Sequence, residues 1–352
     1  MRLVFRGKPT QSRAELFDGY SRQFRRAVDA VFAADETPEL ADRLRANVSR
    51  FAAYKSVYVE GEFAKIAANQ EYDAATRKAA MRAAEDRFAR WTDAEYNTAT
   101  ARCRTAKQFS EFLEPDNRRL FPNLQWLATR SATPRADHAA FAGKIWPKTD
   151  PFWNSHAPGT EWNCKCDIAE TDEPATDNSD VPNIEPPRGL EGNPAETGEV
   201  FTDKVGYIRN APSTFWETFK PTVREVIRQQ NAGFNKTFDT NIGKILVDEI
   251  TIEEVSKGSA TSDSYFLKQE IARNIDKYID KLQRLPDEPV DLGHNNHKGK
   301  FYKRKLDFSA FRAYELKIET TNYKGDKVIY EYTLKMGVFS NGTGYNLYAV
   351  NG

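Results

Sequence analysis

Four side chains that could bind a transition metal lie within residues 135–166. His138 and His156 precede the pair Cys164 and Cys166. Imidazole nitrogen and thiolate sulfur are the usual ligands of structural zinc, so these four residues are candidates for a zinc site. The two cysteines stand closer together than most zinc ligand pairs, however, and His138 lies far upstream of them. The spacing therefore leaves zinc as one interpretation among several, and we expect no other cofactor.

The same stretch fits two interpretations without a metal. Trp146, Trp153 and Trp162 predict a hydrogen-bonded knot packed on indole rings, because buried tryptophan contributes a large apolar area and an N–H group that needs a partner. A cysteine nucleophile activated by histidine would instead need an acid to orient the imidazole. Asp137 and Asp167 are close in sequence, which is weak evidence for that role. All three interpretations remain open from the sequence.

A second group of chemically active side chains lies near residue 300. RNA cleavage without a metal needs a base, an acid and a cation that stabilises the phosphorane. Histidine suits the proton transfers near neutral pH, and lysine and arginine suit the charge. The predicted catalytic residues are His294, His297, Lys305 and Tyr348. The cations predicted to bind nucleic acid are Lys298, Lys300, Lys303 and Arg304. A solvated basic loop is the alternative.

The elements that must position these groups begin with a helical region over residues 14–113. Apolar residues recur there at steps of three and four, as on one face of a helix. In the first helix they are Leu16, Tyr20, Phe24, Val28 and Val31. The run from 74 to 112 places Ala80, Ala84, Phe88, Trp91 and Tyr96 on one predicted stripe. The pattern predicts a helical bundle or a long helical hairpin, and interleaved acids argue against a nucleic-acid arm.

The middle of the chain changes character twice. Residues after 119 predict extended chain leading into the Trp- and Cys-rich stretch. Residues 170–200 are rich in acid, Pro and Gly, and almost nothing in them is expected to be buried. We expect a flexible linker or an extended arm that lies over a neighbour. Residues 201–234 predict a helical connector in which Pro221 opens a turn.

The last part, residues 235–352, alternates helix and strand. A short strand at 242–247 precedes an amphipathic helix that starts near 264. Two strands then flank a Gly-containing turn at 322–326, and a final strand ends the chain. This order predicts a small α+β domain with an antiparallel sheet of three or four strands. The fold class is therefore α+β and multidomain: 1–113 helical, 114–169 the Trp/Cys-rich module, 170–200 the linker, 201–234 the connector and 235–352 the C-terminal domain.

Bulk composition limits the partners. The chain has 352 residues, which favours two or three domains. Lys+Arg and Asp+Glu both count 51, so no global charge draws it to nucleic acid. No apolar run is long enough to span a bilayer, and the first residues lack the apolar core of a signal peptide. Three cysteines argue against a disulfide framework and for synthesis in a reducing cytosol.

Several short motifs in fixed order resemble a phage family. The matching residues are Arg135 with His138, Phe141 with Gly143 and Lys144, Asp150–Pro151–Phe152–Trp153, Pro158–Gly159, and Trp162–Asn163–Cys164–Lys165–Cys166. They resemble the phage Mu F-like head morphogenesis family, with Ala157 where the family often has Pro and Lys165 where it often has Arg. The resemblance covers about residues 120–170 and implies a minor head protein, made in the bacterial host and carried at the portal and capsid interior. Portal, capsid and scaffold proteins would be its partners.

The C-terminal domain loosely resembles the barnase–EndoU–colicin–RelE class of phage-associated nucleases. Its order of strand, helix and antiparallel strands carries this likeness, together with residues 291–305. One hypothesis is thus a minor head protein of a phage or prophage that carries an RNase-like toxin domain acting on RNA. The other is a purely structural head protein whose C-terminal domain binds portal, scaffold or nucleic acid without catalysis.

Overall fold

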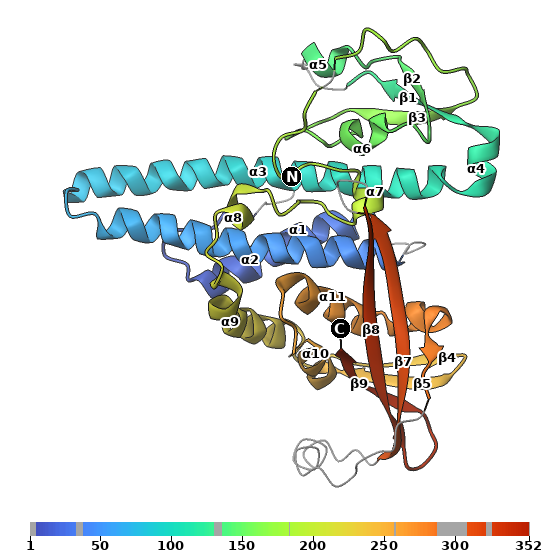
Figure 1. Cartoon of the computed structure of the whole chain (residues 1–352). Helices are drawn as coiled ribbons and strands as arrows, with labels where there is room; N and C mark the ends of the chain where they lie inside the picture. The colour runs from blue at the N-terminus through green and yellow to red at the C-terminus, as the bar shows by residue number, and fades with distance from the viewer. Residues whose placement is uncertain are drawn as a thin grey trace. The chain divides into compact units, whose positions relative to one another are not determined.

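The computed structural model describes residues 5–32, 38–129, 136–182, 184–256, 258–286, 308–321 and 326–351 (Figure 1). Its chain contacts divide into two compact units. The first comprises Met1–Ser213 and Thr320–Lys327, and the second comprises Thr214–Glu319 and Val328–Gly352. The mixture of helices with two separate sheets confirms the predicted α+β class.

Three helices build the first unit, as the apolar periodicity predicts. They are α1 (Arg13–Asp29), α2 (Pro38–Ala68) and α3 (Ala74–Phe112). Ser12 and Glu15 form a reciprocal capping box at the start of α1, which satisfies backbone N–H groups that the helix itself cannot pair. The α2 and α3 helices run side by side as a long hairpin (Figure 1). Leu16, Tyr20 and Phe24 are fully buried against them.

The buried face of α3 includes Ala84 and Phe88 of the predicted stripe but departs from that stripe further along the helix. Trp91 is 40% exposed, whereas Thr92, Glu95 and Arg102 are buried. Inside the helical core, Lys55 Nζ lies 2.6 Å from Glu95 Oε2, and the Tyr207 hydroxyl donates to Glu95 Oε1 at 2.7 Å. Burial lowers the pKa of Lys55 and raises that of Glu95, while their mutual attraction opposes both shifts. The buried ion pair between Lys55 of α2 and Glu95 of α3 thus takes the place of an apolar contact between these two helices.

Residues 187–209 fold back onto α2 and α3. They contain two short helices, α7 (Pro194–Thr197) and α8 (Gly206–Arg209). The fully buried Arg102 guanidinium donates to the carbonyls of Leu190, Glu191, Gly192 and Glu199. Asn47 accepts hydrogen bonds from the N–H groups of residues 200 and 201. The expectation that residues 170–200 bury almost nothing is wrong for 189–200, because these carbonyls find a buried cation and Leu190 enters the core.

The acidic stretch before this fold-back lies against the module as an extended arm. Thr176 N–H donates to the Ile145 carbonyl at 3.1 Å, and Lys144 Nζ contacts Asp180 at 2.6 Å. Most side chains from 172 to 182 remain exposed. One backbone hydrogen bond and one ion pair thus hold the arm against the module while most of its side chains face solvent, as in the second of the two predicted alternatives.

A three-stranded sheet follows α4 (Pro115–Leu120). Its strands are β1 (Asn123–Leu127), β2 (Ile145–Pro147) and β3 (Asp167–Thr171), in the order β2-β1-β3 with both pairs antiparallel. Two short helices, α5 (Ala136–Ala139) and α6 (Phe152–His156), lie in the loops between the strands. Leu124 and Trp126 alternate inward from the central strand, so β1 supplies the core of this small module.

The second unit begins with α9 (Phe215–Gln230), which runs through Pro221. The prediction that Pro221 opens a turn is therefore wrong. Proline removes a helical hydrogen bond at a cost of about 3 kcal/mol, but α9 buries an apolar stripe that offsets this loss. The stripe consists of Phe215, Trp216, Phe219, Val223, Val226 and Ile227.

The second unit contains a six-stranded sheet in the order β4-β5-β9-β8-β7-β6. Its strands are β4 (Asn235–Thr240), β5 (Gly243–Asp248), β6 (Gln283–Arg284), β7 (Phe308–Thr321), β8 (Lys327–Phe339) and β9 (Tyr345–Asn351). The pair β5–β9 is parallel, and the sheet is larger than the three or four strands predicted. The turn residues 322–325 lie outside the described residues.

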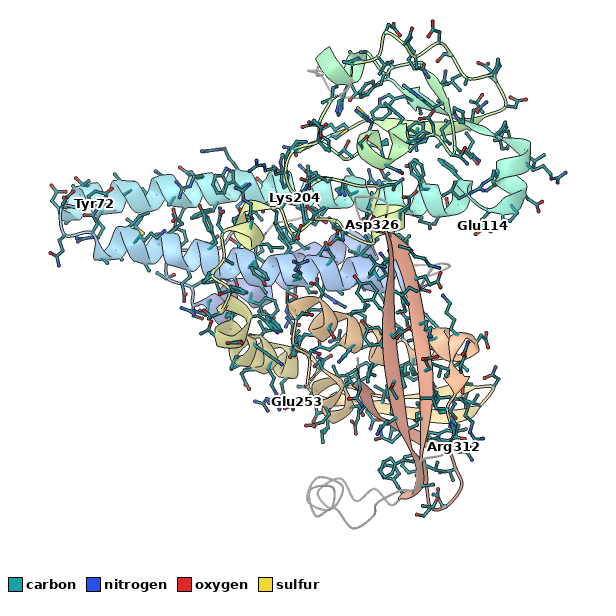
Figure 2. All side chains as sticks on the ribbon, in the orientation of Figure 1. Tyr72, Glu114, Lys204, Glu253, Arg312 and Asp326 are labelled. Atoms are coloured by element: carbon teal, nitrogen blue, oxygen red, sulfur yellow. The ribbon has the colours of Figure 1, made fainter. Side chains whose placement is uncertain are left out.

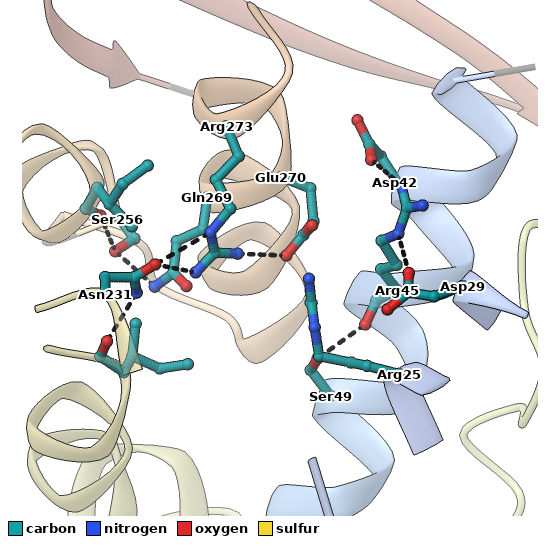
Figure 3. Close-up of polar contacts among 12 residues, drawn as sticks. Arg25, Asp29, Asp42, Arg45, Ser49, Asn231, Ser256, Gln269, Glu270 and Arg273 are labelled. Carbon is teal, nitrogen blue, oxygen red and sulfur yellow. Dashed lines mark hydrogen bonds and ion pairs between the residues drawn. The ribbon is translucent and has the colours of Figure 1, made fainter. Parts of the chain in front are cut away.

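Helices α10 (Glu249–Val255) and α11 (Ser262–Arg273) pack in the second unit, and the 3-10 helix η1 (Ile275–Lys281) continues from α11. Arg273 contacts Asn231 at 3.1 and 3.2 Å and Glu270 at 2.6 Å (Figure 3). Gln269 donates to the Ser256 hydroxyl at 3.1 Å. These contacts tie α11 to the ends of α9 and α10. Among the described helices, none combines the length and apolar character needed to cross a membrane.

Candidate functional site

The module around β1 has an aromatic core. Trp126 and Ile168 face each other across β1 and β3, and Trp146 lies opposite Leu124 across β1 and β2. Helix α6 adds Trp153 to the same face. The buried cluster comprises Phe109, Leu124, Trp126, Phe141, Trp146, Trp153, Ala157 and Ile168. Such a cluster gives a small sheet the apolar contacts that its short strands cannot provide alone.

Ring contacts in this core fix the position of α6. Trp146 stacks on Phe152 with ring centroids 4.0 Å apart, and Phe152 stacks on His156 at 4.6 Å. The Trp153 indole N–H donates to the Pro147 carbonyl at 2.9 Å. Trp146 and Trp153 are therefore packed among aromatic rings, and the Trp153 N–H has a hydrogen-bond partner. Trp162 stacks instead on Phe201, at 5.9 Å.

Three of the four predicted metal ligands meet at one point. His138 Nδ1 lies 3.6 Å from Cys164 Sγ and 3.3 Å from Cys166 Sγ. The three ligand atoms all lie within 4.8 Å of one another. They come from α5, from the loop after α6 and from the residue before β3, so the fold joins parts of the chain that are 28 residues apart.

Helix α3 holds the loop that carries Cys164. Asn163 has φ 59°, the left-handed conformation that asparagine tolerates better than most residues. Its backbone N–H donates to Thr98 Oγ1 at 2.9 Å, and its side chain accepts from Asn97 at 3.1 Å. Gly159, at φ 90°, lies so close to Arg102 that a Cβ would come within 2.9 Å of that side chain. The direction of the Cys164 side chain is thus set from outside the module.

The two thiols have opposite electrostatics. A hydrogen bond from Cys166 lowers the pKa of Cys164 to about 4 against the opposing effect of burial, and the hydrogen bond with His138 acts in the same direction. The contact with Cys164, followed by burial, raises the pKa of Cys166. The backbone N–H of Cys166 also donates to Cys164 Sγ at 3.5 Å. The pKa values of the two thiols are therefore shifted in opposite directions.

His156 is not part of this group. Its Nδ1 lies 2.8 Å from the Ser155 hydroxyl, and its Nε2 accepts the Ile184 N–H at 3.2 Å. Burial lowers the pKa of His156, which favours the neutral ring. Both nitrogens have partners in the arm and in α6, so the ring ties the acidic arm to the module.

The nucleophile interpretation gains no orienting acid from Asp167. Its Oδ1 accepts hydrogen bonds from Gln108 Nε2 at 2.8 Å and from the Ile168 N–H at 3.0 Å. The third cysteine, Cys103, is fully buried in α3, and burial raises its pKa to about 12. Cys103 is thus a structural thiol and a natural control for the other two.

Most of the predicted ribonuclease residues lie outside the described residues. These are His294, His297, Lys298, Lys300, Lys303, Arg304 and Lys305. Tyr348 lies on β9, and its side chain is not described. Arg312 of β7 is labelled in Figure 2. It donates a hydrogen bond to the Tyr345 hydroxyl on β9 and lies over the Tyr345 ring at 5.3 Å. The catalytic roles of His294, His297, Lys305 and Tyr348 stay predictions.

Sequence reasoning missed the neighbours of Cys166. The side chains of Thr129 and Trp126 oppose the rise in the pKa of Cys166. Neither residue belongs to a metal or nucleophile motif. The inward alternation of β1 was the available signal for Trp126, and no signal in the sequence pointed to Thr129.

Two known proteins are similar to part of the chain. One, from Escherichia phage Mu, carries the provisional name capsid assembly protein F; it is 24% identical over 157 residues, which are 39% of this chain and 35% of that protein. The other is the Mu-like prophage FluMu F protein of Haemophilus influenzae, 28% identical over 94 residues, or 25% of this chain and 23% of that protein. The aligned regions thus span about a third or less of each relative.

No family model matches the chain, and no solved structure matches it significantly. The two partial alignments support a relationship with Mu F-like proteins.

Proposed function

We propose that this chain takes part in assembling the head of a Mu-like phage or prophage. The observation that carries the proposal is the partial similarity to two F proteins, one of them named for capsid assembly. The packed module formed by residues 120–171 supports it, since the motifs that resemble the head morphogenesis family lie largely within this one structure. A protein of this kind contributes surfaces for assembly rather than small-molecule chemistry.

A deletion in the phage or prophage that encodes the chain tests this function. We expect lysis to proceed while infectious particles fall sharply and electron microscopy shows defective heads. Complementation with Trp153→Ala should fail, because the substitution empties the centre of the aromatic core. Trp91→Ala is the matched control, since that indole is 40% exposed and outside the module. Normal infectious heads that lack the chain would refute the proposal.

We further propose that the protein is carried in the virion, near the portal, with portal, capsid and scaffold proteins as its partners. The resemblance of residues 135–166 to minor head proteins supports this position. Quantitative mass spectrometry of purified particles should find a few copies per virion. Pull-down of the portal protein by the intact chain should weaken with Trp153→Ala and persist with Trp91→Ala.

A separate proposal gives the second unit an RNase-like effector activity. Its α+β order and the basic histidine stretch between β6 and β7 support the idea. The purified full chain should then cleave RNA in the presence of a chelator. Substitution of His294 or His297 by Ala should lower the rate by about 10²–10⁴-fold, the usual contribution of a proton-transfer group. Intact RNA at micromolar protein would refute the RNase proposal.

A further inference from the structure

We propose that His138, Cys164 and Cys166 bind one zinc ion that cross-links the aromatic module. The ligands are His138 Nδ1 and the two Sγ atoms, with His156 outside the set. This inference does not depend on head assembly, because it rests on the geometry of one side-chain cluster. The chemical class of the ligand is a divalent, tetrahedral, thiophilic cation.

The distances fit a common metal. Sulfur and nitrogen bound to one tetrahedral zinc ion, at bond lengths of about 2.3 and 2.05 Å, lie about 3.6 Å apart. The observed separations between His138 Nδ1 and the two sulfurs are 3.6 and 3.3 Å. Both N···S separations are therefore close to an edge of a zinc tetrahedron, and the two sulfurs lie within 4.8 Å of each other.

Hydrogen bonding alone accounts poorly for this arrangement. One imidazole nitrogen carries either one lone pair or one proton, which points outward in the plane of the ring. It therefore makes one strong hydrogen bond along that direction. Here a single Nδ1 is approached by two sulfurs at nearly equal distance. A metal at the common point satisfies all three atoms at once. The Cys166 N–H that donates to Cys164 Sγ is the kind of second contact that orients a metal-bound thiolate.

The surrounding structure holds the cluster in advance. Cys164 is oriented through Asn163 and helix α3, and Cys166 leads directly into β3. His138 packs on Trp126, with ring centroids 5.9 Å apart. The three strands of the sheet contain only five, three and five residues, so a cross-link between loop, strand and helix adds stability that pairing cannot supply.

The protein supplies three ligands among its described residues, which leaves one tetrahedral position. We assign this position to a water molecule. An open position of this kind is typical of zinc sites with three protein ligands, whereas four-ligand sites are closed.

Elemental analysis of the intact chain, purified under reducing conditions, tests the proposal. We expect about one zinc per chain. Replacement by cobalt should give the intense thiolate-to-cobalt absorption and the visible bands of a tetrahedral site. His138→Gln and the double variant Cys164→Ala/Cys166→Ala should lose the metal. Cys103→Ala and His156→Gln are the controls, since neither residue belongs to the set, and both should retain it.

Thiol labelling keeps the proposal testable if the double variant does not fold. In the wild-type chain, chelator treatment should make two cysteines reactive to an alkylating reagent, and mass spectrometry should identify them as Cys164 and Cys166. Cys103 should react only after denaturation, because it is fully buried. Absence of bound metal, equal labelling with and without chelator, or full metal content in Cys164→Ala/Cys166→Ala would each overturn the zinc site.

Discussion

Replacing Arg102 by Met should unfold the first unit at markedly lower denaturant concentration. Methionine keeps a long apolar side chain but donates no hydrogen bond. In the native protein the guanidinium is fully buried and donates to four carbonyls, with the shortest bonds to Leu190 at 2.8 Å and Gly192 at 3.0 Å. Burial lowers the pKa of Arg102 to about 10, so the group stays charged at neutral pH.

The magnitude follows from the carbonyls left behind. A buried acceptor that loses its donor costs about 1–3 kcal/mol, so the two shorter bonds alone set a loss of about 2–6 kcal/mol. Removing the cation also returns part of its desolvation cost, which is several kcal/mol for a buried ion. We therefore expect a net loss of about 3 kcal/mol, a large fraction of the 5–15 kcal/mol typical of a folded domain.

Urea unfolding followed by tryptophan fluorescence measures this loss. Trp216 alone among the six tryptophans lies outside the first unit, so the signal reports chiefly on that unit. Arg104→Met is the matched control, because Arg104 lies on the exposed face of the same helix. A second readout is proteolysis, which should cut residues 187–202 faster in Arg102→Met. A loss below about 1 kcal/mol, or one equal to that of Arg104→Met, would show that the four carbonyls are satisfied in another way.

Two further substitutions test buried and terminal charges. Lys55→Met should lower the free energy of unfolding by about 3–5 kcal/mol, because it leaves Glu95 buried without its cation. A double variant that also carries Glu95→Gln should recover part of that loss in the same denaturation assay. If the losses of the two single variants simply add in the double variant, the two residues are not coupled. At the start of α3, a hydrogen bond from the Thr76 N–H lowers the pKa of Asp73. The Asp73 carboxylate therefore stabilises the helix at pH values above the ordinary aspartate pKa. This stabilisation is lost as the pH falls through the lowered pKa. Asp73→Asn, which keeps a capping oxygen, should therefore lower Tm at neutral pH and leave it unchanged in acid; an equal Tm difference at both pH values would argue against the charge effect.

The helices of the first unit were predictable because their apolar residues recur at helical spacing. Leu16, Tyr20 and Phe24 are buried as that pattern indicates. The inner face of α3 was not predictable in the same way. Glu95 is buried there because Lys55 pairs with it, and Arg102 is buried because carbonyls of residues 190–199 accept its hydrogen bonds. A pattern of hydrophobic residues does not predict such polar partners.

The candidate site shows the same division. Cys164 and Cys166 were evident as a pair, and His138 was evident as a ligand type. Which histidine would join the cysteines depended on tertiary structure, since His156 lies closer to them in sequence yet is held by Ser155 and Ile184. In the second unit, the parallel pairing of β5 with β9 joins strands about 100 residues apart, and no local pattern encodes it.

The anchoring of residues 187–209 bears on how this protein responds to cleavage. The exposed acidic arm at residues 172–182 is accessible to a protease. A cut in this arm would break the backbone but would not release residues 190–207. Arg102, Asn47 and the Lys55–Tyr207 contact still bind that downstream segment. Cleavage in the arm should therefore leave the two fragments associated under native conditions and separate them only on denaturation.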